Sequence, residues 1–201
     1  TVLEETPFGS RFTLEGKEYT ISLAGRHQCF HAQMVLALLP ILQQAGFGVT
    51  QQDAAEAFAH THFPGRFQVL CRRPFVVVDG AHNPEGVAGL KEILSHIPCP
   101  KKIAAGMLGD KAVEENLKLL AGQSDTLFCL PVDNPRALSP RELAQLARPY
   151  FARVACFETV EQGLAAALEE LEPEEMLLVC GSFFLAGEAV AALDSLLPEG
   201  K

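Results

Sequence analysis

Positive charge is scarce in this sequence and is nowhere concentrated. Among 201 residues, Asp and Glu outnumber Lys and Arg by 25 to 16, the formal net charge is -9, and basic residues never run longer than two. Proteins that bind a phosphate backbone carry a patch or stripe of Lys and Arg. The sequence therefore predicts no nucleic-acid partner.

Long apolar segments are also missing. The longest apolar run, residues 34–42, has nine residues and contains Pro40, whereas a bilayer-spanning helix needs about 20. The opening residues, Thr-Val-Leu-Glu-Glu, have neither the basic nor the apolar region of a signal peptide. We expect a soluble, cytoplasmic protein with no membrane partner.

Cysteine pairs of the CxxC type do not occur. The six cysteines lie 24 to 42 residues apart, which fits neither a compact disulfide framework nor a zinc knuckle. We expect most of them to be small core residues. They are Cys29, Cys71, Cys99, Cys129, Cys156 and Cys180.

Two apparent ligand motifs each lack a required residue. Gly16-Lys17 resembles the end of a phosphate-binding loop, but no GxxxxGK[ST] pattern occurs and a hairpin turn is the simpler prediction. His27 and His31 are spaced as two ligands on one helix face, but Gln28 stands where a zincin has Glu. We predict no metal site in these residues.

The first 61 residues predict a hairpin followed by two helices. Apolar and polar residues alternate on both sides of a turn between residues 8 and 24. One helix is expected from 26 to 45, with Pro40 kinking or dividing it. A second helix is expected from 50 to 60, where a capping-box pattern opens it.

From residue 66 onward, short β-type runs alternate with helical ones. This alternation predicts an α/β fold, a Rossmann-like and mostly parallel sheet with helices on both faces. We place the domain boundary at residue 61, giving domains 1–61 and 62–201. The expected strands are 67–71, 75–79, 102–107, 126–130, 153–157 and 176–180, and the expected helices are 85–96, 111–122, 140–148, 160–171 and 183–196.

Ligands of open parallel sheets bind beyond the carboxyl ends of the strands, and the strand ending at Asp79 carries the most polar groups. Asp79 can accept hydrogen bonds from a ribose or hold a cation, and His82 can donate to a phosphate or carboxylate. A helix follows at Pro84, and its free N–H groups favour anions. The alternative is that Asp79 and Asn83 only cap this helix.

Other strand ends add further polar groups. Residues 106–111 supply glycines and Lys111, residues 131–136 supply Arg136, and Gly181-Ser182 places a hydroxyl at a helix start. Each of these is common in α/β proteins. Together they predict one polar crevice along one edge of the sheet.

The order of these motifs resembles the C-terminal part of the folylpolyglutamate synthases, which are often also dihydrofolate synthases and which belong to the Mur ligase family. Upstream, Gly25-Arg26-His27-Gln28 with Ala32 is similar to the family's central-domain helix. The resemblance covers nearly the whole chain. It rests on Phe63-Pro64-Gly65-Arg66-Phe67, Asp79-Gly80-Ala81-His82-Asn83-Pro84, Gly106-Met107-Leu108-Gly109-Asp110-Lys111 and Val179-Cys180-Gly181-Ser182.

The resemblance implies an ATP-dependent ligase that adds glutamate to a folate. In this family ATP phosphorylates the terminal carboxylate of the folate, and the amino group of glutamate attacks the resulting acyl phosphate. The implied small-molecule partners are folate, glutamate and ATP. Mg²⁺ is implied as well, with its ligands in an N-terminal part outside these residues.

The resemblance also assigns roles to particular residues. Arg66 and Asp79 are expected to contact ATP, with Arg66 at the phosphates and Asp79 near the ribose and at the catalytic centre. His82 is expected at the transferred phosphate or the incoming glutamate, as a catalytic and substrate-binding residue. Ser182 and Lys111 are expected substrate contacts.

One further ATP contact departs from the family pattern. His31 stands where the family's central-domain helix has an Asn. An imidazole offers one hydrogen bond at a time on each nitrogen and does not reproduce the paired donor and acceptor of an amide.

The resemblance leaves the family's phosphate loop, magnesium ligands and modified lysine N-terminal to the residues present. We therefore expect residues 1–61 to be the tail end of the central ATP-binding domain and residues 62–201 to be the C-terminal ligase domain. By itself the fragment is expected to be inactive, and the full-length enzyme is expected to be a monomer. Two alternatives stay open: a non-catalytic, stand-alone nucleotide-binding or interaction module, and a Mur-type ligase with another acceptor.

Overall fold

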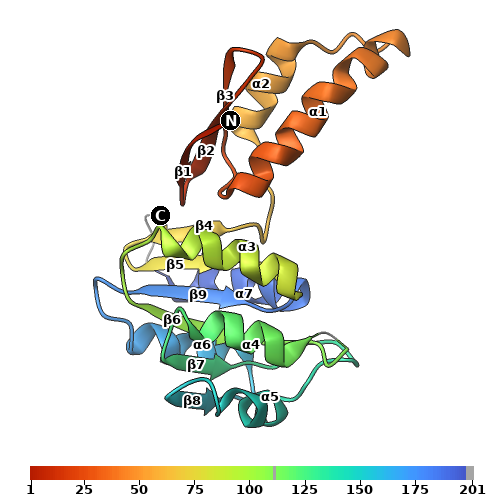
Figure 1. The fold of residues 1–201 in the computed structure, drawn as a ribbon. Coiled ribbons are helices and arrows are strands. Elements are labelled where there is room, and N and C mark those ends of the chain that lie inside the picture. The colour runs from red at the N-terminus through yellow and green to blue at the C-terminus, as the bar shows by residue number, and fades with distance from the viewer. Residues whose placement is uncertain (111, 198–201) are drawn as a thin grey trace. The chain divides into compact units, whose positions relative to one another are not determined.

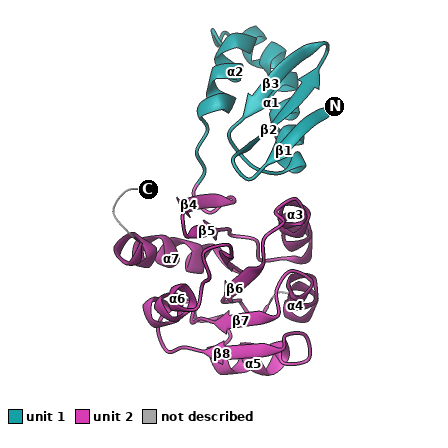
Figure 2. Cartoon of the chain, turned by 90° about the vertical axis from the view of Figure 1, so that its left-hand side faces the viewer, with its two compact units in different colours: residues 1–63 teal, residues 64–201 magenta. Residues whose placement is uncertain are grey.

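The computed structural model describes residues 1–110 and 112–197, and the chain forms two compact units (Figure 2). The first unit is Thr1–Phe63, and the second begins at Pro64. The division falls at a turn signal, Phe63-Pro64-Gly65, close to the boundary expected at residue 61.

The first unit is a three-stranded antiparallel sheet with two helices packed against it. Its elements are β1 (Val2–Thr6), β2 (Gly9–Leu14), β3 (Lys17–Ile21), α1 (Arg26–Gln44) and α2 (Gln51–His60), with strand order β1-β2-β3 (Figure 1). Strands β2 and β3 form the predicted hairpin. Alternate residues turn inward, and the paired rings of Phe12 and Tyr19 stack with centroids 5.3 Å apart. Buried residues of both helices complete this core.

Two sequence expectations for this unit have different outcomes, and one strand was not expected. The capping box is confirmed, since Thr50 and Asp53 each accept the other's backbone N–H. Strand β1 is not predicted, because Glu4 and Glu5 interrupt its apolar pattern and pairing with β2 holds it. Pro40 was expected to kink or divide α1, and the division does not occur, because the helix is continuous. Pro40 removes only the hydrogen bond to the carbonyl four residues earlier, and the hydrogen bonds and packing of the rest of the helix are enough to continue it.

The second unit is a six-stranded sheet between two layers of helices, which confirms the predicted fold class. Strand order is β4-β5-β9-β6-β7-β8, with β4 antiparallel to β5 and all other neighbours parallel. Helices α3 and α4 cover one face of the sheet, and α6 and α7 cover the other (Figures 1 and 2). The elements are β4 (Gln68–Arg72), β5 (Phe75–Val78), α3 (Pro84–Ser95), β6 (Lys101–Ala105), α4 (Val113–Ala121), β7 (Thr126–Cys129), α5 (Pro140–Ala147), β8 (Arg153–Cys156), α6 (Val160–Glu169), β9 (Met176–Cys180) and α7 (Phe183–Leu196).

Continuous apolar strands lie where the sheet is covered on both faces. All five residues of the central strand β9 are buried, as are three of the four residues of β5.

Four of the six cysteines are buried, and all six are free thiols. Burial, followed by the neighbouring Cys156, raises the pKa of the Cys129 thiol to about 12. Within residues 1–110 and 112–197, no helix is both long and apolar enough to cross a bilayer.

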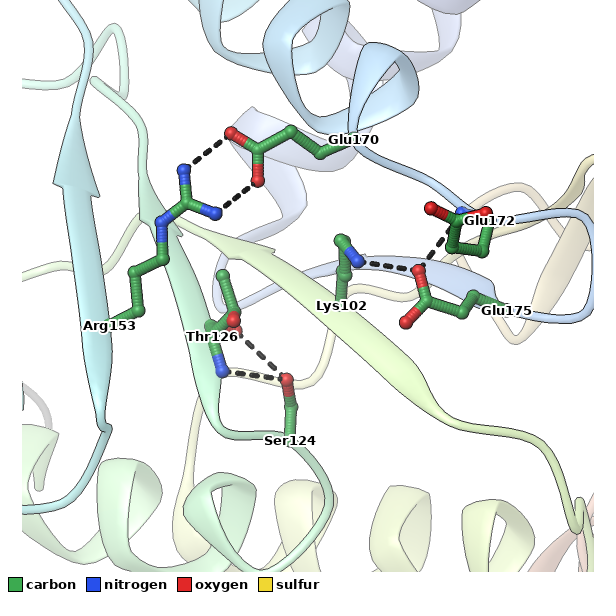
Figure 3. Close-up of polar contacts among 7 residues, drawn as sticks. All are labelled: Lys102, Ser124, Thr126, Arg153, Glu170, Glu172 and Glu175. Atoms are coloured by element: carbon green, nitrogen blue, oxygen red, sulfur yellow. Dashed lines mark hydrogen bonds and ion pairs between the residues drawn. The ribbon is translucent and has the colours of Figure 1, made fainter.

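Ion pairs between side chains of the second unit lie at the amino-terminal edge of the sheet (Figure 3). Lys102 at the start of β6 bonds Glu175 at 2.5 Å, and Arg153 at the start of β8 makes a two-pronged pair with Glu170. The Glu172 N–H also donates to Glu175. These acidic residues neutralise basic groups of the sheet.

Substituting Gly163 tests the packing of α6 against the sheet. A Cβ at Gly163 would lie 2.1 Å from Cδ2 of the buried Leu130, whereas a Cβ at Gly187 of α7 meets nothing within 4 Å. We expect Gly163→Ala to lower the free energy of unfolding by about 1–3 kcal/mol. Gly187→Ala should raise it by about 0.5–1 kcal/mol. Urea unfolding followed by circular dichroism measures both free energies. Equal effects of the two substitutions would contradict the close approach of Gly163 to Leu130.

A second test concerns the ion pair at Glu175. Burial opposes ionisation of this carboxyl, but hydrogen bonds from Lys102 and the Glu172 N–H, together with the Lys102 charge, lower its pKa below 4.5. A lowered folded-state pKa stabilises the fold above the unfolded value, and this contribution is lost as pH falls through the folded value.

We therefore expect Glu175→Gln to lower the free energy of unfolding by about 1 kcal/mol at pH 7, with the deficit shrinking below pH 4.5. The matched control is the exposed Glu174→Gln, whose effect should stay near zero at both pH values. A deficit for Glu175→Gln that is constant from pH 7 to pH 3 would show that its charge is not the cause.

Candidate functional site

Asp79 follows strand β5 and anchors two loops at the carboxyl edge of the sheet. The side chain is only 8% exposed. Its Oδ2 accepts the N–H of Phe67 and its Oδ1 accepts the N–H of Ala81, both at 2.7 Å. A buried carboxylate needs such bonds to offset its lost hydration. Asp79 therefore fixes the loop of residues 65–67 against the loop of residues 79–83.

The capping alternative holds for one of the two residues it names. Asn83 is the N-cap of α3 and accepts the Gly86 N–H at 2.8 Å. Asp79 does not cap the helix, because its bonds go to the two loops. Two backbone donors do not exhaust the acceptor capacity of a carboxylate.

His82 is held on both sides by hydrogen bonds. Its Nδ1 lies 2.9 Å from the Gly80 carbonyl oxygen. A carbonyl only accepts, so Nδ1 carries the proton and Nε2 accepts when the ring is neutral or donates when it is charged. The His82 carbonyl accepts from Nδ2 of Asn116, a fully buried residue of α4.

Arg66 and His82 both contact the ring of Phe183. The Arg66 guanidinium carbon lies 4.6 Å from the ring centroid, and the His82 ring lies 5.6 Å from it. A Cβ at Gly80 would come within 2.3 Å of the same ring, so only glycine fits there without displacing it. The aromatic ring is the shared contact of a cation, an imidazole and a tight loop.

Ser182 lies at the start of α7 and caps that helix. It is 2% exposed, and its Oγ accepts the Phe184 N–H at 3.1 Å. The preceding Gly181 has φ 105° and donates to the Ala81 carbonyl, which ties this loop to the 79–83 loop. A serine oxygen that accepts one bond can still donate its own proton.

Cys180, the last residue of strand β9, is a neutral residue. Complete burial raises the pKa of its thiol, and the negative charge of Asp79 raises it further. Cysteine reacts as the thiolate. Cys180 is therefore a packing residue of the sheet and not a nucleophile.

Two neighbouring loops extend this edge beyond β6 and β7. Arg136 forms an ion pair with Asp110 at 2.6 Å, and its carbonyl accepts the Gly109 N–H. The pair is about half exposed, so it contributes at most about 1 kcal/mol. Lys111, a sequence-predicted substrate contact of the adjoining loop, lies outside the described residues.

His31 belongs to the first unit, on α1. Its Nδ1 lies 3.2 Å from Oε1 of Gln28, and its ring meets that of His27 edge-on at 5.9 Å. Gln28 also contacts Nε2 of His27, so the amide bridges the two imidazoles. Among residues 1–110 and 112–197, no group of three or more His, Cys, Asp or Glu side chains is arranged to hold a metal ion.

Comparison with known proteins identifies the family of the second unit. The model of the family described as "Mur ligase, glutamate ligase domain" matches residues 65–183. This is more than half of the chain and contains Arg66, Asp79, His82 and Ser182. The chain belongs to the Mur ligase family.

Particular relatives are folate ligases. The chain is 29% identical over 165 residues to dihydrofolate synthase/folylpolyglutamate synthase of Escherichia coli, a match that spans 81% of this chain and 38% of that protein. It is 27% identical over 186 residues to folylpolyglutamate synthase of Lacticaseibacillus casei, spanning 89% and 42%. The chain thus spans about two fifths of the length of these relatives.

Solved structures show the same architecture. Escherichia coli FolC, solved with DHPP and ADP, matches with a TM-score of 0.79 and 25% identity over 98% of this chain and 45% of that one. Mycobacterium tuberculosis folylpolyglutamate synthase, solved with ADP and AMPPCP, matches with a TM-score of 0.78 and 26% identity over 97% and 47%.

Sequence reasoning missed two residues of the site. Phe183 follows the Gly181-Ser182 motif directly and is partly exposed, at 38%. Asn116 carries no sequence signal, because a polar residue in a helix is normally solvated. In the structure it is fully buried, and its Oδ1 has no hydrogen-bond partner among the described residues.

A double-mutant cycle tests the contact between Gly80 and Phe183. We expect Gly80→Ala to lower the free energy of unfolding by about 1–3 kcal/mol, because the added methyl group collides with the ring. In a Phe183→Ala background the same change should cost less, with a coupling energy of about 1–3 kcal/mol. Urea unfolding of the four proteins gives the cycle. Additive effects would show that the ring does not limit residue 80.

Proposed function

We propose that the complete gene product containing this chain is an ATP-dependent folylpolyglutamate synthase, which adds glutamate to a folate, and that it also acts as a dihydrofolate synthase. Residues 62–201 supply its glutamate ligase domain, and residues 1–61 belong to its central ATP-binding domain. The observation that carries the proposal is the grouping of Arg66, His82 and Asp79 at the carboxyl edge of a Mur ligase sheet. The relatives' names and their bound nucleotides support it.

The reaction proceeds in two displacements. A carboxylate oxygen of the folate attacks the γ-phosphorus of ATP, and ADP leaves. The glutamate nitrogen, having lost one proton, then attacks the acyl carbon, and as the amide forms the nitrogen gives up a second proton and inorganic phosphate leaves, carrying that proton as hydrogen phosphate. The site must neutralise phosphate charge, hold two anionic substrates and keep water from the acyl phosphate.

Arg66 and His82 meet the first two demands. The exposed guanidinium of Arg66 presents fixed donors to a phosphate, and the Phe183 ring holds its position. Nδ1 of His82 is bound to the Gly80 carbonyl, so Nε2 is the ring nitrogen that acts on a ligand. Nε2 can take the proton that the glutamate ammonium loses, or donate to the transferred phosphate when protonated.

The other assignments rest on the family resemblance. Asp79 accepts a ribose hydroxyl in addition to its two backbone donors, Ser182 donates to the glutamate carboxylate, and His31 and Lys111 add contacts to ATP and substrate. Mg²⁺, when bound, neutralises phosphate charge, but the described residues offer no ligand cluster for it. Its ligands belong to the part of the enzyme outside this chain, and the chain alone is inactive. The complete enzyme acts as a monomer.

The direct test is a ligation assay with the complete gene product, ATP and Mg²⁺. We expect ATP-dependent addition of glutamate to a reduced folate and to dihydropteroate, detected by mass spectrometry. Replacing glutamate with other amino acids, including diaminopimelate, distinguishes this activity from that of another Mur-type ligase. ATP binding without ligation to any acceptor would favour a non-catalytic module, and the 201-residue chain alone should show no turnover.

A substitution at Arg66 tests the site itself. We expect Arg66→Ala to lower kcat/KM about 100-fold, equivalent to about 2.7 kcal/mol of transition-state stabilisation. The control is Arg148→Ala at the exposed end of α5, which should stay within about twofold because it removes the same charge away from the site. Equal activity of the two variants would remove Arg66 from the mechanism.

A further inference from the structure

Helix α1 exposes a row of large apolar side chains, which we name the outer α1 face: Phe30, Met34, Leu38 and Ile41. These residues are 51%, 58%, 52% and 61% exposed. Their spacing of three or four residues places them on one side of the helix. Val35 and Leu42 flank the row and are also exposed, at 43% and 38%.

The opposite side of the same helix is already used. Cys29, Ala32, Leu36 and Leu39 are buried in the core of the first unit, each at most 6% exposed. A helix that is apolar on both sides is typical of the interior of a protein. Contiguous exposed apolar patches mark interaction surfaces. The outer α1 face therefore needs a second covering surface.

The chemistry of this face restricts its partner. No Asp, Glu, Lys or Arg occurs from residue 27 to residue 52. A nucleic acid would find no cation to neutralise its phosphates, and helices that lie on anionic membranes carry Lys and Arg on their polar side. The face fits an apolar protein surface that buries it by close packing.

We propose that the outer α1 face is the docking surface for the part of the ligase that relatives carry beyond the region they share with this chain. Solved ligases match 97–98% of this chain, including the first unit, and carry more than half of their own length outside the match. The proposal rests on the proposed function only in taking the complete gene product to be longer than 201 residues. It requires no particular substrate.

The length of the first unit supports this occupant over a second copy of the chain. Its 63 residues lie in the range where a single small core gives marginal stability. A covering surface within the same polypeptide is present at every protein concentration, whereas a second copy covers the helix only when the chain is concentrated.

Methionine oxidation tests the proposal with internal controls. The sequence has three methionines: Met34 is 58% exposed, whereas Met107 and Met176 are 1% and 0% exposed. The 201-residue chain and the complete gene product are treated with dilute hydrogen peroxide, and sulfoxide formation is followed by peptide mass spectrometry. In the 201-residue chain at low micromolar concentration, Met34 should react at least about tenfold faster than the other two.

In the complete gene product, the Met34 rate should fall at least tenfold, towards the rates of Met107 and Met176. An unchanged Met34 rate, or a complete gene product with no folded region beyond these residues, would overturn the proposal. Protection of Met34 in the 201-residue chain that grows with concentration, with a dimer in sedimentation velocity, would assign the face to a second copy and also overturn it. Ligase activity is not read in this experiment, so its outcome is separable from that of the glutamate assay.

Paired substitutions on the two sides of α1 give a second readout. Leu38→Gln changes the outer α1 face, and Leu36→Gln makes the same change two residues away in the buried core. In the 201-residue chain, Leu38→Gln should leave the urea midpoint unchanged while Leu36→Gln lowers it. In the complete gene product, both should lower it. The proposal would be overturned if Leu38→Gln left the urea midpoint of the complete gene product unchanged. It would also be overturned if, in the 201-residue chain, Leu38→Gln lowered the midpoint as much as Leu36→Gln does.

Discussion

The site depends on one buried carboxylate. Asp79 receives two backbone N–H groups from loops that are far apart in sequence, each at 2.7 Å. Hydrogen bonds to a charged group contribute about 1.5–3 kcal/mol each, and a buried charge left without them is strongly destabilising. The loop that carries Arg66 and the loop that carries His82 are therefore fixed together before any ligand binds. Such preorganisation is what the proposed phosphoryl transfer requires of its site.

The distribution of charge is compatible with the proposed anion site in an acidic protein. At the amino edge of the sheet, acidic residues neutralise Lys102 and Arg153, while at the carboxyl edge backbone N–H donors stabilise the buried carboxylate of Asp79. Arg66 then faces an aromatic ring. The net charge of -9 therefore says little about local anion binding.

The predictability of the fold and of the site differs for a physical reason. The strands of the second unit were predictable to within two residues, because burial on both faces demands continuous apolar runs such as residues 75–78 and 176–180. Asp79, His82 and Ser182 could be selected as candidates because strand ends are marked in the sequence by glycine and polar residues. Phe183 and Asn116 were missed, because their roles arise from contacts between loops and helices that no local pattern encodes. Strand β1 was missed for the same reason, since its pairing with β2 outweighs its weak pattern.

The effects of substitutions in the two units have to be interpreted differently. The second unit has many completely buried side chains, from α3 and α4 on one face of the sheet and from α6 and α7 on the other, so it accounts for its own apolar surface. The first unit does not, because the outer α1 face leaves side chains more than half exposed on a helix with no charged residue after Arg26. Apolar burial stabilises a fold in proportion to the area removed from water. Changes at Arg66, His82 or Phe183 therefore report on the site, whereas changes in α1 report on whatever surface completes the first unit.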